Sequence, residues 1–151
     1  MPRWRAWATN DDGSAALEFI TVGVILLVPF AYLVIVLGAI QEQSLGAEAA
    51  ARHIARTIAL STDQESAAIA ADAVLTGVVD EYGMAAEVTD VALACVPEGA
   101  ECPAGGATLR VTVTTVVRMP FVPEMLSLEE TLAVPLEAVA VQKIGRGWEG
   151  G

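Results

Sequence analysis

The stretch FITVGVILLVPFAYLVIVLGAI, residues 19–40, decides the fold of this chain. It holds no charged side chain, and at about 1.5 Å of rise per residue a helix of this length reaches roughly 33 Å, enough for a hydrocarbon core of about 30 Å. A helix buried in a soluble domain would normally show a polar stripe, which this stretch lacks. Pro29 lies inside it, and membrane helices tolerate an internal proline better than exposed soluble helices do. The stretch therefore predicts one membrane-spanning helix.

Basic residues near the helix predict its orientation. Arg3 and Arg5 precede the apolar stretch, and no Lys or Arg follows it until Arg52. Because positively charged flanks stay on the cytoplasmic side, we expect a single-pass protein of the plasma (inner) membrane with a cytoplasmic N-terminus. Its C-terminal part then lies outside the cytoplasm.

A cleaved secretory signal is the alternative for residues 1–40. Its apolar core would be about 7–15 residues, much shorter than the stretch here, and a small-residue cleavage site should follow. The nearest candidate, Ala47-Glu48-Ala49, carries a glutamate in the middle. A membrane anchor fits these features better.

Composition limits the function classes. The chain has 151 residues, with 19 Asp and Glu against 8 Lys and Arg and a formal net charge of −11. Phosphate binding needs clustered basic side chains, so nucleic acid is not an expected partner. The acidic excess is more typical of an exposed domain that must stay soluble.

The two cysteines, Cys95 and Cys102, lie in a stretch rich in proline and glycine. In an oxidising compartment, such a short turn-rich segment favours a disulfide. Two unrelated thiols, or half of a metal site, are the alternatives. No second cysteine pair exists and the only histidine, His53, lies far away in the sequence, so we expect no metal and no cofactor.

Residues 41–60 continue as a helical pattern. Apolar positions recur at spacings of three and four, and Glu48 and Arg52 form an i,i+4 pair opposite them; the apolar positions are Ala47, Ala51, Ile54 and Ile58. Such a stripe of small and apolar residues fits a subunit interface as well as packing on the chain's own domain. His53 is most simply a polar surface residue.

Downstream of this helix the pattern changes to a second helix and then to strands. Ser61-Thr62-Asp63 interrupts the first helix, Thr62 and Glu65 fit a capping box, and the next helix should stop near Gly83. Its apolar positions include Ile69, Ala73, Leu75, Val78 and Val79. Strands are predicted at 87–96, 108–119 and 131–143, with a loop at 120–130. Pro135 indicates an edge strand or a bulge, and the glycine-rich residues 145–151 predict a flexible tail.

These elements predict an α+β fold. A long N-terminal transmembrane helix continues into an exported helix, and a second helix packs on a small antiparallel sheet of about three strands. The expected organisation is residues 1–13 as a leader, 14–40 as the transmembrane helix, 41–144 as the exported domain and 145–151 as the tail.

The segment Gly13-Ser14-Ala15-Ala16-Leu17-Glu18 places a carboxylate at the start of the apolar helix, where it is costly to bury. Helix capping is one explanation, with Glu18 as an ordinary acidic first-turn residue. The other is a cut between Gly13 and Ser14. The new α-amino group has a pKa near 8, is largely cationic, and lies close enough on a helix for Glu18 to compensate it. Glu18 of one copy can equally pair with the amino terminus of a neighbouring copy.

GSAALEF followed by a long apolar helix resembles the prepilin signature of type IV pilins. That signature is a short polar leader, a glycine, a cut, and glutamate as the fifth mature residue; Gly13, Ser14 and Glu18 fall in those places. The mature first residue would be Ser14 rather than an aromatic residue. With LEF and the later Val28-Pro29, the pattern is most similar to TadE-type proteins, the minor pilins or pseudopilins of Tad (Flp) pilus systems.

Two later segments are also similar to that family. SLGAEAAARHIART, residues 44–57, resembles its Ala- and Arg-rich stretch, and residues 110–144 resemble its two-strand ending with a Pro-Phe-x-Pro turn. The resemblance implies processing by a prepilin peptidase, partners among other pilin-like subunits through the N-terminal helix, and a place in pilus assembly or in surface pili. An uncleaved, membrane-anchored extracytoplasmic binding or sensor domain is the alternative.

An enzyme is the third class, and we do not expect one. The chain has one histidine, no free cysteine expected, and no Ser/His/Asp grouping or phosphate-binding loop. Acidic residues such as Asp72, Asp80 and Glu81 are more simply a solvated helix face. No small-molecule substrate is therefore expected.

Overall fold

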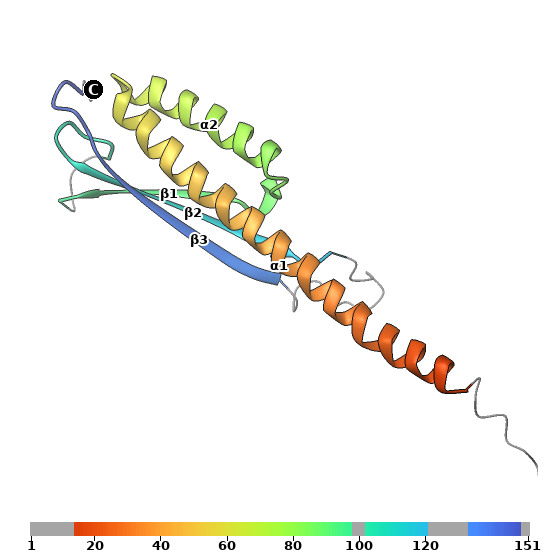
Figure 1. The fold of residues 1–151 in the computed structure, drawn as a ribbon. Helices are drawn as coiled ribbons and strands as arrows, with labels where there is room; N and C mark the ends of the chain where they lie inside the picture. Colours follow the sequence, from red (N-terminus) through yellow and green to blue (C-terminus); the bar gives the residue numbers. More distant parts are fainter. Residues whose placement is uncertain (1–13, 98–101, 121–132, 149–151) are drawn as a thin grey trace, which may run out of the picture. The chain divides into compact units, whose positions relative to one another are not determined.

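The computed structural model describes residues 14–97, 102–120 and 133–148. They form the helices α1 (Ser14–Leu60) and α2 (Gln64–Glu81), a short 3-10 helix η1 (Ala86–Val88), and the strands β1 (Asp90–Val96), β2 (Thr108–Arg118) and β3 (Ala133–Lys143) (Figure 1). The predicted α+β class is confirmed: a long apolar N-terminal helix, a second helix and a three-stranded antiparallel sheet. The loop predicted at 120–130 lies, except for Pro120, outside the described residues.

The chain divides into two compact units, Met1–Leu37 and Gly38–Gly151. We call residues 16–37 of α1 the apolar segment, and Gly38–Gly151 the second unit. The helix continues through Pro29 without a break. The rest of this subsection concerns the second unit.

α2 begins and ends with local signals that the sequence carries. Asp63 is its N-cap: the carboxylate accepts a hydrogen bond from the backbone N–H of Ser66 at 2.8 Å, and a second from the Ser66 hydroxyl at 2.9 Å. The capping box predicted for Thr62 and Glu65 is therefore wrong, because the Thr62 hydroxyl donates to Asp63 instead. At the other end Gly83 has a positive φ of 58°, so the predicted stop there is confirmed.

The sheet has the order β1-β2-β3 with antiparallel pairing throughout. β2 alternates strictly, and its buried side chains are Leu109, Val111, Val113, Thr115 and Val117. The strand predicted at 108–119 is confirmed for residues 108–118. The buried Thr115 hydroxyl is hydrogen-bonded to that of Thr89, at 3.0 Å, so no polar group of this pair is left unsatisfied in the core.

The edge position predicted from Pro135 is also confirmed. Pro135 lies in β3, opposite Val116 of β2, and β3 is an edge strand of the sheet. Proline cannot donate a backbone hydrogen bond, and at an edge none is required of it. β1 is shorter than predicted, because residues 86–88 form η1 instead of extended strand.

The core of the second unit lies between the sheet and both helices, which cover the same face of the sheet (Figure 1). The predicted stripe of α1 is buried in this core: Ala47, Ala51, Ile54 and Ile58 are each at most 2% exposed. Of the two interpretations of the stripe, packing on the chain's own domain is therefore the one observed. Burying an isoleucine side chain contributes about 1.5–3 kcal/mol.

α2 contributes less to the core than the sequence predicts. Its fully buried residues are Ala67 and Val78, whereas Leu75 and Val79 are partly buried and Ile69 is exposed. The largest buried helical side chains, Ile54 and Ile58, come from α1. The sheet therefore rests on two helices, of which the later part of α1 carries the larger side chains.

α1 and the end of α2 approach each other closely at Gly46. A Cβ atom added at Gly46 would lie 2.8 Å from Cβ of Tyr82 and 2.9 Å from Sδ of Met84. No side chain fits there without a shift of its neighbours. This glycine is thus required by packing rather than by its backbone angles.

The end of the chain joins the core as well. The amide of Ile144 donates to the carbonyl of Ala107, the amide of Gly106 donates to the carbonyl of Ile144, and the Trp148 side chain is 9% exposed within the core. Trp148 is thus packed in the core, within the segment 145–151 for which the sequence predicts a flexible tail. A single large aromatic side chain buries enough surface to order this glycine-rich segment. The remainder of the predicted tail lies outside the described residues.

Candidate functional site

The processing motif meets the described structure at the start of α1. Ser14 is the first residue of this helix, and Glu18 follows one turn later with an exposed side chain. Gly13, the residue predicted to precede the cut, lies outside the described residues. The structure describes no residue before Ser14, so both interpretations of Glu18, helix capping and pairing with a new amino terminus, stay predictions. Ser14 and Glu18 are four residues apart, and residues with this spacing are neighbours on the surface of a helix.

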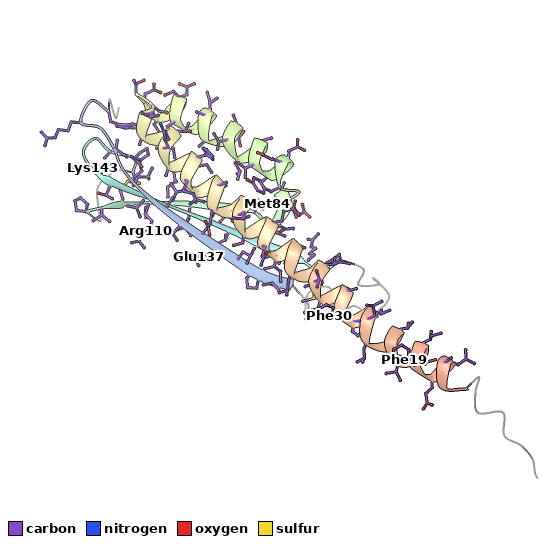
Figure 2. The ribbon with its side chains drawn as sticks, in the orientation of Figure 1. Phe19, Phe30, Met84, Arg110, Glu137 and Lys143 are labelled. Atoms are coloured by element: carbon purple, nitrogen blue, oxygen red, sulfur yellow. A yellow bond between two sulfur atoms is a disulfide. The ribbon has the colours of Figure 1, made fainter. Side chains whose placement is uncertain are left out.

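The apolar segment is exposed along its length within its own unit. Phe19 is 80% exposed, Leu26 65% and Leu33 53%, and an 18-residue window in this helix is long and apolar enough to span a membrane. Figure 2 shows Phe19 and Phe30 projecting from the helix. The hydroxyl of Thr21 donates to the carbonyl of Leu17 at 2.7 Å, which satisfies its donor within the helix. A bilayer would accept such a surface, whereas water would not.

The predicted disulfide between Cys95 and Cys102 is confirmed. Their Cα atoms are 5.5 Å apart, Cys95 is buried in the core, and Cys102 packs against it. The metal-site and free-thiol alternatives for these two residues are wrong, because both sulfurs are bonded to each other. The bond joins Cys95 in β1 to Cys102, six residues before β2 begins.

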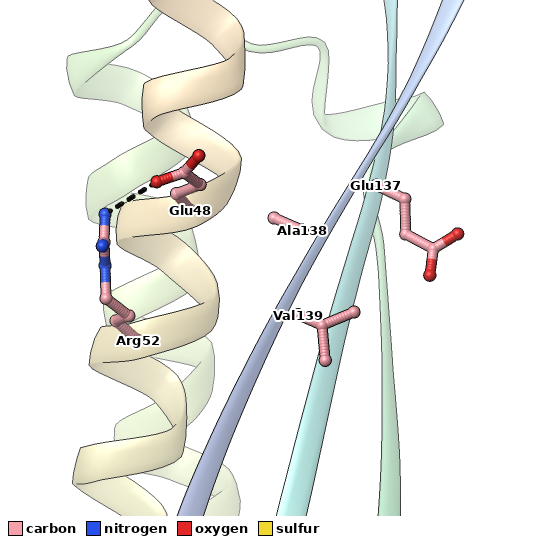
Figure 3. Close-up of a pocket in the computed structure, with 5 residues that line it drawn as sticks. All are labelled: Glu48, Arg52, Glu137, Ala138 and Val139. Carbon is pink, nitrogen blue, oxygen red and sulfur yellow. Dashed lines mark hydrogen bonds and ion pairs between the residues drawn. The ribbon is translucent and has the colours of Figure 1, made fainter.

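A small hollow of about 220 Å³ lies between α1 and β3, lined by Glu48, Arg52, Glu137, Ala138 and Val139. Arg52 donates to Glu48 at 3.1 Å, which confirms the predicted i,i+4 pair, and Glu137 points away from both (Figure 3). Both partners of the ion pair are more than half exposed, so water screens it and it contributes little. The arrangement offers no carboxylate positioned against a nucleophile or a second acid.

The remaining titratable groups include His53, Asp63 and the acidic residues of α2. No group of three or more His, Cys, Asp or Glu side chains comes close enough there to hold a metal ion. His53 is exposed, as predicted. The pKa of the Asp63 carboxyl lies below its ordinary value of 3.8, chiefly because the carboxylate accepts the backbone hydrogen bond of Ser66. Asp63 therefore stabilises the N-terminus of α2.

Sequence reasoning missed two positions that shape the second unit. Gly46 is one of many small residues in its stretch, and only the approach of Tyr82 and Met84 distinguishes it. Trp148 was hidden by the glycines around it, although a lone tryptophan in a polar tail is a usable signal of packing. Neither position bears chemistry. Both contribute to the packing of the second unit.

Comparisons with known proteins give no relative for this chain. No protein-family model, no curated protein and no solved structure matches it.

Proposed function

We propose that the chain is a TadE-like, pilin-related structural subunit. It is cut between Gly13 and Ser14 by a prepilin peptidase and acts in the assembly of a Tad (Flp) type pilus at the cell envelope. The observation that carries the proposal is the spacing of Gly13, Ser14 and Glu18 directly before an apolar helix of membrane-spanning length.

The chemistry of the cut gives Glu18 its role. Cleavage creates a cationic α-amino group at Ser14, one helical turn from Glu18. In the low dielectric near a bilayer an unpaired carboxylate is costly, so Glu18 gains from pairing with an amino terminus. An exposed Glu18 is available to the terminus of a neighbouring copy as well as to its own. This pairing exists only after processing, and it couples the cut to assembly.

The second unit supports export to the far side of the membrane. Its disulfide suits an oxidising compartment, and the basic flank of Arg3 and Arg5 favours a cytoplasmic N-terminus. Together these features support a single-pass protein of the inner membrane with an extracytoplasmic domain. The role in a pilus is proposed from the family resemblance alone.

Cleavage is tested by measuring the intact mass and the N-terminal sequence of the chain purified from membranes, with and without the peptidase. We expect the mature chain to begin at Ser14 only when the peptidase is present. A Gly13→Leu variant serves as the matched control, since a bulky residue before the cut should block it and leave Met1 in place. Retention of Met1 in the unaltered chain with active peptidase would refute the proposal.

Assembly is tested separately with Glu18→Ala. This variant should insert in the membrane as well as the unaltered chain, yet appear in sheared surface filaments in much smaller amounts. Glu18→Asp keeps the charge and should retain part of the recovery. Equal recovery of all three chains would assign Glu18 to the helix terminus alone.

An uncleaved membrane-anchored binding or sensor domain is the second candidate. The observation that favours it is that the second unit has its own core and disulfide, and that this core includes no described residue before Ala47. The cleavage measurement separates the two candidates directly.

A further inference from the structure

The sheet of the second unit has one covered face and one open face. The open face carries the side chains of β2 that alternate with the buried set, together with their partners in the register on β1 and β3. No described element packs on it; both helices lie on the other side (Figure 1).

One half of this open face is apolar and basic. Around Arg110 the register places Ala94 on one side and Val141 on the other, and the neighbouring rows add Val96, Val139 and Lys143. Val96, Val139 and Val141 are 49–57% exposed on this face. No carboxylate lies in these rows; Asp90 and Glu137 share a row nearer the other end of the face. We call these six residues the outer patch, and Figure 2 shows Arg110 on the side of the sheet away from the helices.

α2 presents the complementary surface. Its exposed stripe at helical spacing comprises Glu65, Ile69, Asp72, Thr76 and Asp80, and the helix contains no Lys or Arg. Ile69 is 66% exposed in the middle of this acidic stripe. α2 therefore offers carboxylates around an apolar centre, whereas the outer patch offers cations among valines.

The two surfaces lie on opposite sides of the same unit, so a single chain cannot join them within itself. We propose that the outer patch of one copy receives the exposed stripe of α2 from a second copy, with Ile69 against Val139 and Val141 and the acidic residues facing Arg110 and Lys143. Opposite charges make the two surfaces complementary, because all the charged residues of α2 are acidic and all those in these rows of the sheet are basic. A helix laid on the open face covers it as α1 and α2 cover the other.

The contact joins two different surfaces, so each copy can give one and receive the other. Such head-to-tail contacts extend along a row of copies unless the rotation between them closes a ring. This inference deepens the proposed function and rests on it in one respect: copies must meet in the same membrane. The contact itself does not require the cut at Gly13.

The test uses the full chain in membranes, produced as two differently tagged copies. One copy carries Ile69→Cys and the other Val141→Cys, while the native Cys95–Cys102 bond stays intact and does not react with a short bis-maleimide reagent. We expect a mixed-tag cross-linked dimer when both copies are present and none from either variant alone. A chain with both substitutions should give a ladder of larger species. His53→Cys, exposed on α1, replaces Ile69→Cys as the matched control and should not cross-link to Val141→Cys.

Charge reversal tests the choice of partner. Arg110→Glu in the copy with Val141→Cys should lower the mixed dimer about five- to tenfold, and Asp72→Arg in the other copy should restore it. Arg110 and Asp72 are exposed, and formation of the native disulfide reports that each variant has folded.

Three outcomes would overturn the proposal: no mixed dimer, cross-linking of either variant alone as in a symmetric contact, or cross-linking to a different protein. Each is read on chains whose N-terminus has been determined. A chain that keeps Met1 but gives the mixed dimer refutes the proposed processing and supports the contact. A processed chain that gives no mixed dimer supports the processing and refutes the contact.

Discussion

Two segments of the same helix, α1, use apolar residues in different ways. The apolar segment, residues 16–37, is exposed, with Phe19 80% exposed, and from Phe19 onward it is apolar around its whole circumference. Residues 46–58, which we call the packed segment, have one apolar stripe with Ile54 1% exposed, and Arg52 and His53 on the other side. The first is long and apolar enough to cross a membrane, whereas the second packs against other residues of its own unit. The distribution of apolar residues around the helix, rather than their number, distinguishes the two.

Charges placed in the apolar segment should have the largest effect. Leu26→Lys and Leu33→Lys should each cost about 2.5–3.5 kcal/mol of insertion free energy near the centre of a membrane helix, so the double variant should not insert stably. Alkaline extraction of membranes measures the fraction retained. The matched control is the double variant Leu45→Lys and Leu60→Lys. Both residues lie on the same helix after the apolar segment and are 57% and 74% exposed, so retention should be unchanged. Equal extraction of both double variants would show that charge is tolerated equally in the apolar segment and after it.

Truncation of one side chain in each segment sharpens the comparison. Ile54→Ala should lower the free energy of unfolding of the second unit by about 2–5 kcal/mol, because it leaves a cavity between α1 and the sheet. Leu26→Ala removes a similar volume from the apolar segment and should not change that quantity. Hydrogen exchange of the β2 amides in detergent micelles measures it for both. A loss in the Leu26 variant as large as that in the Ile54 variant would show that the units are not separate.

A pair of glycines tests how closely the packed segment approaches its neighbours. Gly46→Ala should destabilise the second unit by about 1–3 kcal/mol, because the new methyl group collides with Tyr82 and Met84. Gly77→Ala has no atom within 4 Å of its new methyl group and should stabilise α2 by about 0.5–1 kcal/mol. Thermal unfolding followed by circular dichroism measures both shifts. Shifts of the same sign would contradict the close approach at Gly46.

The smallest effect concerns Asp63, at the turn between the packed segment and α2. Its pKa is lowered in the folded state by the hydrogen bond from Ser66, so its contribution is present above its ordinary pKa of 3.8 and is lost as pH falls through the folded value. Asp63→Asn keeps an acceptor without the charge. We expect the unaltered chain to melt at a higher temperature than Asp63→Asn at neutral pH, with the difference disappearing in strong acid. A difference independent of pH would mean that the charge has no part in the cap.

Sequence reasoning reached most of the elements whose determinants are local, although it missed the short helix η1. The apolar segment, the interruption at Ser61, the stop at Gly83, the alternation of β2 and the edge position of Pro135 all follow from short-range chemistry. Pairing of Cys95 with Cys102 was predicted for the same reason, since the two lie in one turn. The capping residue failed because three candidates, Ser61, Thr62 and Asp63, stand side by side, and the choice depends on where the first helical turn closes. The processing motif is a sequence signal throughout, and it remains a prediction.

The sequence by itself determined that residues 19–40 suit a membrane and that Ile54 and Ile58 lie on one stripe, because helical periodicity is a property of the chain alone. Only the tertiary structure decided that this stripe packs on the chain's own sheet, that Gly46 must stay small, and that Trp148 closes the core. It also left Ile69 and the outer patch uncovered on opposite sides of one unit. These outcomes depend on which surfaces meet across long separations in sequence, and no local pattern contains that information.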